Sequence, residues 1–147
     1  MPAFGSYTGG LNINSKEFLV FNEHNIKENI SQYIAPMLQG KHAGILSEAG
    51  LPCIADPGSE IVAEAHRQNI DVVPLTGPSS IILALIASGF NGQNFAFHGY
   101  LPVDKALRAK KLRQLEMDAV KNNETQIFIE TPYRNLQIIQ SISETCH

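Results

Sequence analysis

Short apolar runs alternate along the chain with longer stretches whose apolar residues recur at helical spacing. The runs predict strands at residues 17–21, 43–46, 71–75, 94–98 and 126–130. The longer stretches predict helices at residues 26–38, 59–68, 79–88 and 104–119, with a last helix beginning near Pro132. Strand and helix in regular alternation are typical of parallel strands joined by crossover helices. The pattern therefore predicts an α/β fold with a parallel sheet.

The same pattern suggests how the chain is organised. Residues 1–14 contain glycine and no periodicity, and they are expected to form a loop or tail. The segment Gly99-Tyr100-Leu101-Pro102 has the composition of a linker, which predicts one α/β domain at residues 15–101 and the start of a second at residues 102–147. A parallel strand needs neighbours to bury both of its faces. One strand and one helix after the linker are too few for a domain, so the sequence is expected to be part of a larger protein.

Composition narrows the class of protein. With 147 residues, 44% of them hydrophobic, the chain is long enough to bury a core. The net charge of −3 argues against bulk attraction to nucleic acid. The longest apolar run, residues 81–87, is too short to cross a membrane, and no secretory signal is visible, so a cytoplasmic protein without membrane association is expected. Scattered histidines and two distant cysteines, Cys53 and Cys146, predict reduced thiols and no metal site.

Three loops follow predicted strands, where open parallel sheets bind their ligands. They are the first loop at residues 47–52 (SEAGLP), the second at residues 56–59 (DPGS) and the third at residues 76–80 (TGPSS). Small residues and free amides at helix starts suit a carboxylate or a ribose. A plain strand–helix connection explains the first loop equally well. Helix capping by side chains such as Asp56 or Ser59 explains the other two.

A fourth segment, Glu130-Thr131-Pro132-Tyr133-Arg134, also follows a strand and opens a helix. Glu130 can accept a hydrogen bond from an amine or hydroxyl, and Arg134 can pair with a phosphate or with Glu130 itself. An exposed first helical turn with proline at its start is the alternative. No GxGxxG or GxxxxGK run is present, which argues against a standard dinucleotide site and a P-loop.

Taken together, these segments resemble the tetrapyrrole methylase superfamily. The run SEAGLPCIADPG at residues 47–58 is similar to its signature, and VPLTGPSS at residues 73–80 is similar to its next motif. The segments GYLP at residues 99–102 and IETPYR at residues 129–134 resemble the branch that methylates a cytidine 2′-hydroxyl in small-subunit ribosomal RNA. The resemblance covers roughly residues 18 to 146.

The resemblance implies an enzyme, a methyltransferase that holds S-adenosylmethionine in a cleft between two α/β domains and forms a homodimer when complete. The residues that it implies for cofactor binding are Ser47, Glu48, Ala49, Gly50, Asp56, Pro57, Gly58, Pro78, Ser79, Ser80, Thr131 and Pro132. Glu130 is the candidate general base for a ribose hydroxyl, and Arg134 would orient it or hold a phosphate. A structural ion pair explains both residues as well.

The sequence departs from the family in several places. Glu48 stands where the ribosomal RNA branch commonly has Asp, Leu51 replaces a common Thr, and Tyr133 replaces a common His. The family's opening strand and its loop have no counterpart before Phe18, and most of the second domain is missing after Cys146. These departures leave only part of the cleft.

A basic stretch bears on the substrate. Five cationic residues fall within the helix predicted at residues 104–119, namely Lys105, Arg108, Lys110, Lys111 and Arg113. On a solvent face they can bind an RNA backbone, although a simple solvated face is the common role of such a run. Three hypotheses follow: a ribosomal RNA 2′-O-methyltransferase, a methyltransferase for a tetrapyrrole or another small molecule, and an inactive or merely cofactor-binding fragment.

Overall fold

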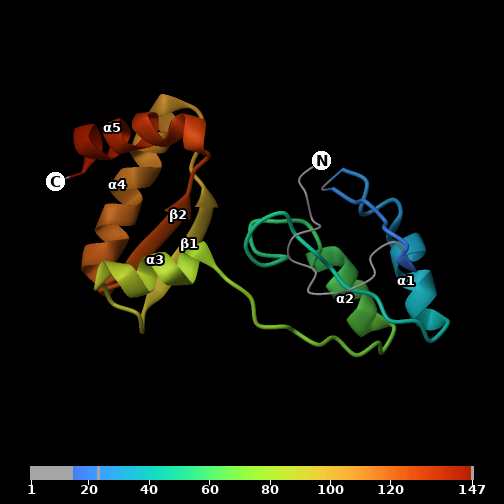
Figure 1. The fold of residues 1–147 in the computed structure, drawn as a ribbon. Helices are drawn as coiled ribbons and strands as arrows, with labels where there is room; N and C mark the ends of the chain where they lie inside the picture. The colour runs from blue at the N-terminus through green and yellow to red at the C-terminus, as the bar shows by residue number, and fades with distance from the viewer. Residues whose placement is uncertain (1–14, 23, 147) are drawn as a thin grey trace. The chain divides into compact units, whose positions relative to one another are not determined.

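The computed structural model describes residues 15–22 and 24–146. Backbone contacts divide the chain into two compact units, which are described one at a time (Figure 1). Unit 1 comprises Met1–Glu48 and Pro52–Leu75, and unit 2 comprises Ala49–Leu51 and Thr76–His147. The sequence predicts a domain boundary at residues 101–102 from a linker-like composition, whereas these units are defined by backbone contacts. The predicted boundary therefore stays a prediction.

Unit 1 is built from two helices, α1 (Ile30–Leu38) and α2 (Ser59–Arg67), which pack against each other. Their apolar faces enclose a core of Ile26, Tyr33, Ile34, Ile61 and Ala65. The Tyr33 ring meets Phe21 edge-on at a centroid distance of 5.6 Å, and its hydroxyl donates to the carbonyl of Val20 over 3.2 Å. These contacts hold the extended segment that precedes α1 against the helix.

The helix predicted from residue 26 begins four residues later, at Ile30. Side chains of Asn22 and Asn25 explain the delay. The Asn25 amide donates to Oδ1 of Asn22 over 3.0 Å, and the Asn22 amide donates to Oδ1 of Asn25 over 2.7 Å. Asparagine competes with the helix in this way, because its side chain offers the backbone a local turn. Ile26 still enters the core, from that turn.

Three predicted strands are wrong. Residues 17–21, 43–46 and 71–75 are not strands, and no strand is assigned among the residues of unit 1 that the structure describes. Their apolar side chains are largely exposed, with Val20 at 84%, Leu46 at 70% and Val73 at 74%. A strand requires a hydrogen-bonded neighbour as well as apolar residues. Each of these segments has the composition of a strand but has no neighbouring strand to pair with among the described residues.

Unit 2 carries the sheet. Its elements are α3 (Ser80–Ser88), β1 (Phe95–Tyr100), α4 (Lys105–Asn122), β2 (Thr125–Ile129), the short 3-10 helix η3 (Pro132–Arg134) and α5 (Asn135–Thr145). Strands β1 and β2 are parallel, with Phe95 opposite Thr125 and Tyr100 opposite Ile129. The register is irregular between Phe97 and Tyr100, where Gly99 adopts a positive φ of 64°. Parallel strands joined by a helix confirm the predicted α/β class.

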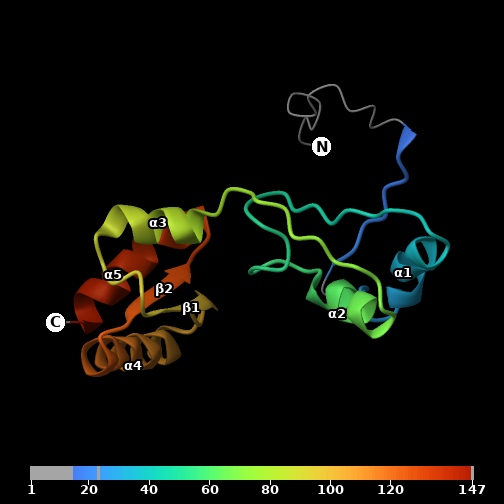
Figure 2. The same ribbon diagram turned by 90° about the horizontal axis from the view of Figure 1, so that it is seen from below.

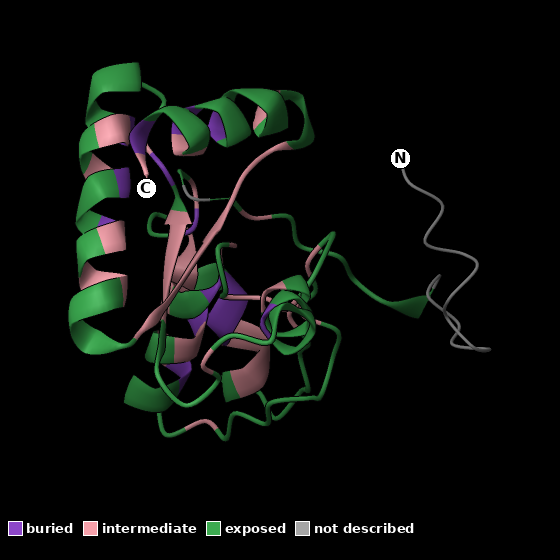
Figure 3. Ribbon diagram, turned by 90° about the vertical axis from the view of Figure 1, so that its left-hand side faces the viewer, coloured by how far each residue is buried: buried purple, intermediate pink, exposed green. Residues whose placement is uncertain are grey.

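Helices lie on both sides of these strands (Figure 2). Both α3 and α4 contact β2, and α4 also packs against α5. The core between α4, α5 and β2 contains Leu101, Leu112, Leu115 and Ile138, with Phe128 beside them. Figure 3 shows the two strands at intermediate burial and the outer side of α4 exposed. Unit 2 therefore has its own hydrophobic core.

The helix ends of unit 2 follow local side-chain chemistry. Asp104 is the N-cap of α4, and its carboxylate accepts a hydrogen bond from the Leu107 amide. Asn123 ends α4 in the left-handed conformation that asparagine tolerates. The helix predicted at residues 104–119 is thus confirmed, three residues longer at its end. Within the described ranges, no helix has the length and apolarity needed to span a membrane.

Candidate functional site

Residues 49–51 of the first loop meet the third loop within unit 2. A Cβ added to Gly77 would lie only 2.8 Å from Cδ2 of Leu51, so the Leu51 side chain packs directly over Gly77. Gly50, beside Leu51, has a positive φ of 73°. The contact brings residues 49–51 against the segment that leads into α3. It also means that an apolar side chain, in place of the family's common hydroxyl, borders this part of the candidate site.

The second loop packs within unit 1, at the start of α2. Gly58 is the N-cap of this helix and has a φ of 133°. A Cβ placed there would come within 3.1 Å of Sγ of Cys53 and 3.5 Å of Cγ2 of Ile45. Only glycine adopts such a conformation readily, so the loop needs Gly58 for its shape. Cys53 and Ala55 also have positive φ values, of 68° and 52°, and this kind of strain is common in functional loops.

Neither α2 nor α3 begins with a side-chain cap. Gly58 has no side chain to offer, and the Ser79 side chain, at the N-cap of α3, makes no capping hydrogen bond. The Ser59 hydroxyl donates instead to Oε2 of Glu60 over 3.1 Å. The capping alternative for the second and third loops is therefore wrong. At α2 the Glu60 carboxylate accepts backbone hydrogen bonds from its own amide and from that of Gly58. The first-turn amides of α3 have no side-chain cap, and the first turn of a helix favours negative charge.

The fourth segment forms a compact cluster around Glu130. Its Oε1 accepts hydrogen bonds from the Thr131 amide over 2.8 Å and from the Thr131 hydroxyl over 3.3 Å. Its Oε2 lies 3.1 Å from Nη2 of Arg134, and the two side chains are only 4% and 14% exposed. Oε2 of Glu130 and Nε of Arg134 nevertheless have no well-aligned hydrogen-bond partner. The pair is close enough to attract, and each member keeps a buried polar atom that a ligand can satisfy.

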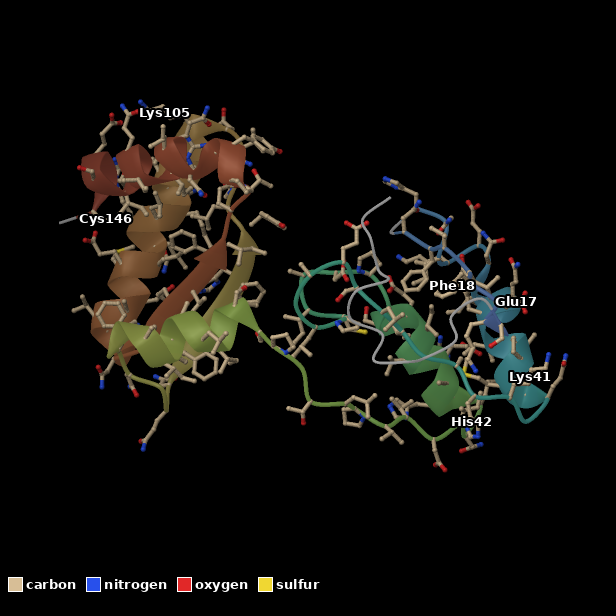
Figure 4. The ribbon with its side chains drawn as sticks, viewed as in Figure 1. Glu17, Phe18, Lys41, His42, Lys105 and Cys146 are labelled. Carbon is tan, nitrogen blue, oxygen red and sulfur yellow. The ribbon has the colours of Figure 1, made fainter. Side chains whose placement is uncertain are left out.

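The five basic residues predicted to share a solvent face do not share one. Lys110 and Arg113 are exposed and Lys111 is half-buried. Lys105, labelled in Figure 4, extends toward α5 and forms an ion pair with Glu144 at 3.2 Å. Arg108 is 5% exposed, so its predicted place on the solvent face is wrong.

Arg108 instead fastens α4 to its surroundings. Its Nε donates to the Ser141 hydroxyl on α5 over 2.9 Å. Its Nη1 donates to the carbonyls of Val103 over 2.7 Å and Pro102 over 3.3 Å. A guanidinium has five donors in a rigid fork, which suits a site with several acceptors. The helical wheel could have found this role, because Arg108, Leu112 and Leu115 fall on one side of α4.

The two thiols are poor nucleophiles. Burial raises the pKa of Cys53, and the carboxylates of Asp56 and Glu60 raise it further. Burial also raises the pKa of Cys146, with Glu116 adding to the effect and Arg113 opposing it. Both thiols stay protonated at neutral pH, which leaves Glu130 as the stronger candidate for acid–base chemistry.

These features define the class of the chain: an α/β protein with a glycine-containing loop at a helix start in each unit and a buried Glu–Arg pair in unit 2. The family model of the Tetrapyrrole (Corrin/Porphyrin) Methylases matches residues 13–146. The chain belongs to this family, which confirms the resemblance found in the motifs.

Curated relatives are similar over most of the chain. The ribosomal RNA small subunit methyltransferase I of Thermotoga maritima is 39% identical over 129 residues, which cover 88% of this chain and 56% of the relative. Its namesake in Vibrio cholerae is 33% identical over 138 residues, which cover 94% and 46%. That of Bacillus subtilis is 38% identical over 125 residues, which cover 84% and 41%. The chain spans about half the length of the curated relatives it matches.

Proposed function

We propose that the protein transfers a methyl group from S-adenosylmethionine to a ribose 2′-hydroxyl of small-subunit ribosomal RNA. The observation that carries the proposal is the uncapped start of α3, which directly follows one of the family's motif loops. Helix N-termini of this kind are suited to the carboxylate and hydroxyl groups of a cofactor. The names of the curated relatives support ribosomal RNA as the substrate.

Each unit offers residues suited to such a cofactor. In unit 1, Gly58 brings backbone rather than side chain to the start of α2, and Asp56 and Pro57 precede it. In unit 2, the hydroxyls of Ser79 and Ser80 flank the first turn of α3. The remaining proposed contacts are Ser47, Glu48, Ala49, Gly50, Pro78, Thr131 and Pro132. When bound, S-adenosylmethionine supplies an electrophilic methyl group on its sulfonium.

Glu130 is proposed to accept the proton of the ribose hydroxyl. Its Oε2 is buried beside Arg134 and lacks an aligned hydrogen-bond partner, so this oxygen keeps the capacity to accept from a hydroxyl. Thr131 holds the other oxygen through its amide and its hydroxyl. Arg134 is proposed to position the carboxylate through their 3.1 Å contact. General-base assistance of this kind contributes about 100-fold to 10,000-fold to a rate.

Labelled methyl transfer to undermethylated small ribosomal subunits tests the proposal. The parent is expected to label the RNA, and Glu130→Gln is expected to lower kcat by about 100-fold or more with KM for S-adenosylmethionine nearly unchanged. The control is Glu144→Gln, which removes an exposed carboxylate from α5 and is expected to retain activity. Label on a porphyrin precursor and not on RNA would instead support a small-molecule methyltransferase.

A homodimer and a cytoplasmic location complete the proposal. Exposed apolar residues on α3, including Leu83 and Ile86, are consistent with further burial in a larger assembly. Sedimentation of the complete protein distinguishes a dimer from a monomer.

A further inference from the structure

Three cations on α4 face the same way. A helix turns by about 100° per residue, which places Lys110, Arg113 and Lys121 within a sector of about 80°. All three are exposed, on the side of α4 that faces away from Leu112 and Leu115. Figure 3 shows this outer side of the helix as exposed. We call Lys110, Arg113 and Lys121 the outer ridge of α4.

The outer ridge contains three positive charges and no acidic residue. Ion pairs in the described part of the chain join Arg67 to Glu64, Lys105 to Glu144 and Arg134 to Glu130. None of them includes a ridge cation. Two acidic residues of α4 flank the ridge, because Glu116 lies three positions after Arg113 and Asp118 three positions before Lys121. Asp118 is engaged by the Gln114 side chain over 2.9 Å.

The dimensions of the ridge suit an extended chain of negative charges. Lys110 and Lys121 are eleven positions apart, or about 16 Å along the helix axis. Met117 lies between them and is 56% exposed, so a flexible apolar side chain sits beside the cations. A nucleic-acid backbone combines regularly spaced phosphates with less polar sugars. The ridge matches both parts of that surface.

We infer that the outer ridge of α4 binds the phosphate backbone of a single-stranded segment of the RNA substrate. The inference rests on the proposed function and deepens it, because it replaces a diffuse basic stretch with three cations. Lys121 was not among the sequence-based candidates, and Arg108 is removed from them by its internal hydrogen bonds. The overall charge of −3 means that attraction to RNA must be local.

Salt-dependent binding of a short fluorescent single-stranded RNA to the full 147-residue chain tests the inference. Each phosphate contact contributes about −0.7 to the slope of log affinity against log salt. The triple variant Lys110→Gln, Arg113→Gln, Lys121→Gln is expected to flatten the slope by about 2. Between about 50 and 200 mM salt, the parent is then expected to lose about 20-fold more affinity than the triple variant.

Lys41→Gln is the matched control for the single variant Lys121→Gln. Lys41 is an exposed lysine of unit 1, labelled in Figure 4. The Lys41→Gln variant is expected to leave the slope of log affinity against log salt unchanged. Lys121→Gln is expected to flatten that slope by about 0.7. Equal flattening by the two variants would overturn the inference, because the attraction would then be diffuse.

Two further outcomes separate this inference from the proposed function. An unchanged slope in the triple variant, with RNA binding by the parent, overturns the ridge and leaves the proposed function standing. If the parent chain binds a polyglutamate probe and does not bind RNA, the ridge is not an RNA site. That result also overturns RNA as the proposed substrate. Calorimetry with S-adenosylmethionine on the triple variant is expected to match the parent, which shows that the substitutions leave the fold and the cofactor loops intact.

Discussion

Unit 1 and unit 2 contain similar sequence patterns and form different structures. In unit 2, the helix α4 connects two strands that pair side by side. In unit 1, α1 and α2 enclose a core, and the apolar segments at residues 17–21, 43–46 and 71–75 form no strand pair among the described residues. Phe18, labelled in Figure 4, lies in one such segment and is 63% exposed. The comparison teaches that helices in this chain form from local sequence, whereas strands form only where a partner is present.

The difference matters for the candidate site. In unit 2, Glu130 follows a paired strand and is held by Thr131 and Arg134. In unit 1, residues 56–58 follow a run of turns in which Cys53 and Ala55 have positive φ values, and the side chains of Cys53 and Ile45 lie close to Gly58. Loops fixed by a sheet are positioned more firmly than loops fixed by a few apolar contacts. The candidate residues of unit 2 are thus better positioned within their unit than those of residues 56–58 within unit 1.

Cavities in the two cores are expected to give the largest effects. Leu112→Ala in unit 2 and Ile26→Ala in unit 1 each remove a buried side chain, at a cost of about 2–5 kcal/mol. Because the two cores share no residue, Leu112→Ala is expected to accelerate amide exchange in α4 and α5, and Ile26→Ala in α1 and α2. Hydrogen-exchange mass spectrometry measures this. Equal acceleration in all four helices would contradict two separate cores.

Loss of the Arg108 hydrogen bonds is expected to have the second-largest effect on stability. Arg108→Gln removes a buried cation that donates to Ser141, Val103 and Pro102, and a decrease in the free energy of unfolding of about 2–3 kcal/mol is expected. Arg113→Gln is the control on the exposed side of the same helix and is expected to change stability by less than about 0.5 kcal/mol. Urea unfolding compares them. Similar midpoints for the two variants would mean that Arg108 does not fasten α4.

A glycine substitution tests the second loop with a smaller expected effect. Gly58→Ala forces a side chain into a φ of 133° and against Sγ of Cys53, at a cost of about 1–2 kcal/mol. Gly44→Ala is the matched control, because the space around Gly44 is open and no positive φ is required. It is expected to be neutral or slightly stabilising. Thermal unfolding distinguishes them, and a Gly58→Ala variant as stable as Gly44→Ala would argue against the described loop.

Much of this fold follows from local sequence. The helices at α2, α3 and α4 match their predicted ranges within a few residues, since apolar periodicity, Gly89 and Asp104 are signals within the chain. Strands β1 and β2 were also predicted, each shifted by a residue or two. The strands at residues 17–21, 43–46 and 71–75 could not be judged, because pairing depends on residues far away in sequence.

In the candidate site, too, contacts between residues close in sequence are predictable and contacts between distant residues are not. The pairing of Glu130 with Arg134 is one of the two partnerships that the sequence suggests for Arg134, because the opposite charges lie only four positions apart. The burial of Arg108 against Ser141 was missed, because the contact joins residues 33 positions apart. The contact between Leu51 and Gly77 was missed for the same reason. Local pairs are visible in a sequence, and contacts between elements are not.

Calorimetric titration of the 147-residue chain with S-adenosylmethionine tests the central claim most directly. Ser80→Pro removes one amide donor from the first turn of α3, where proline is tolerated, and Ser80→Ala removes only the hydroxyl. The account predicts one-site binding that Ser80→Pro weakens by about tenfold or more and Ser80→Ala weakens less. Absence of heat and of any thermal shift in the parent chain would contradict it.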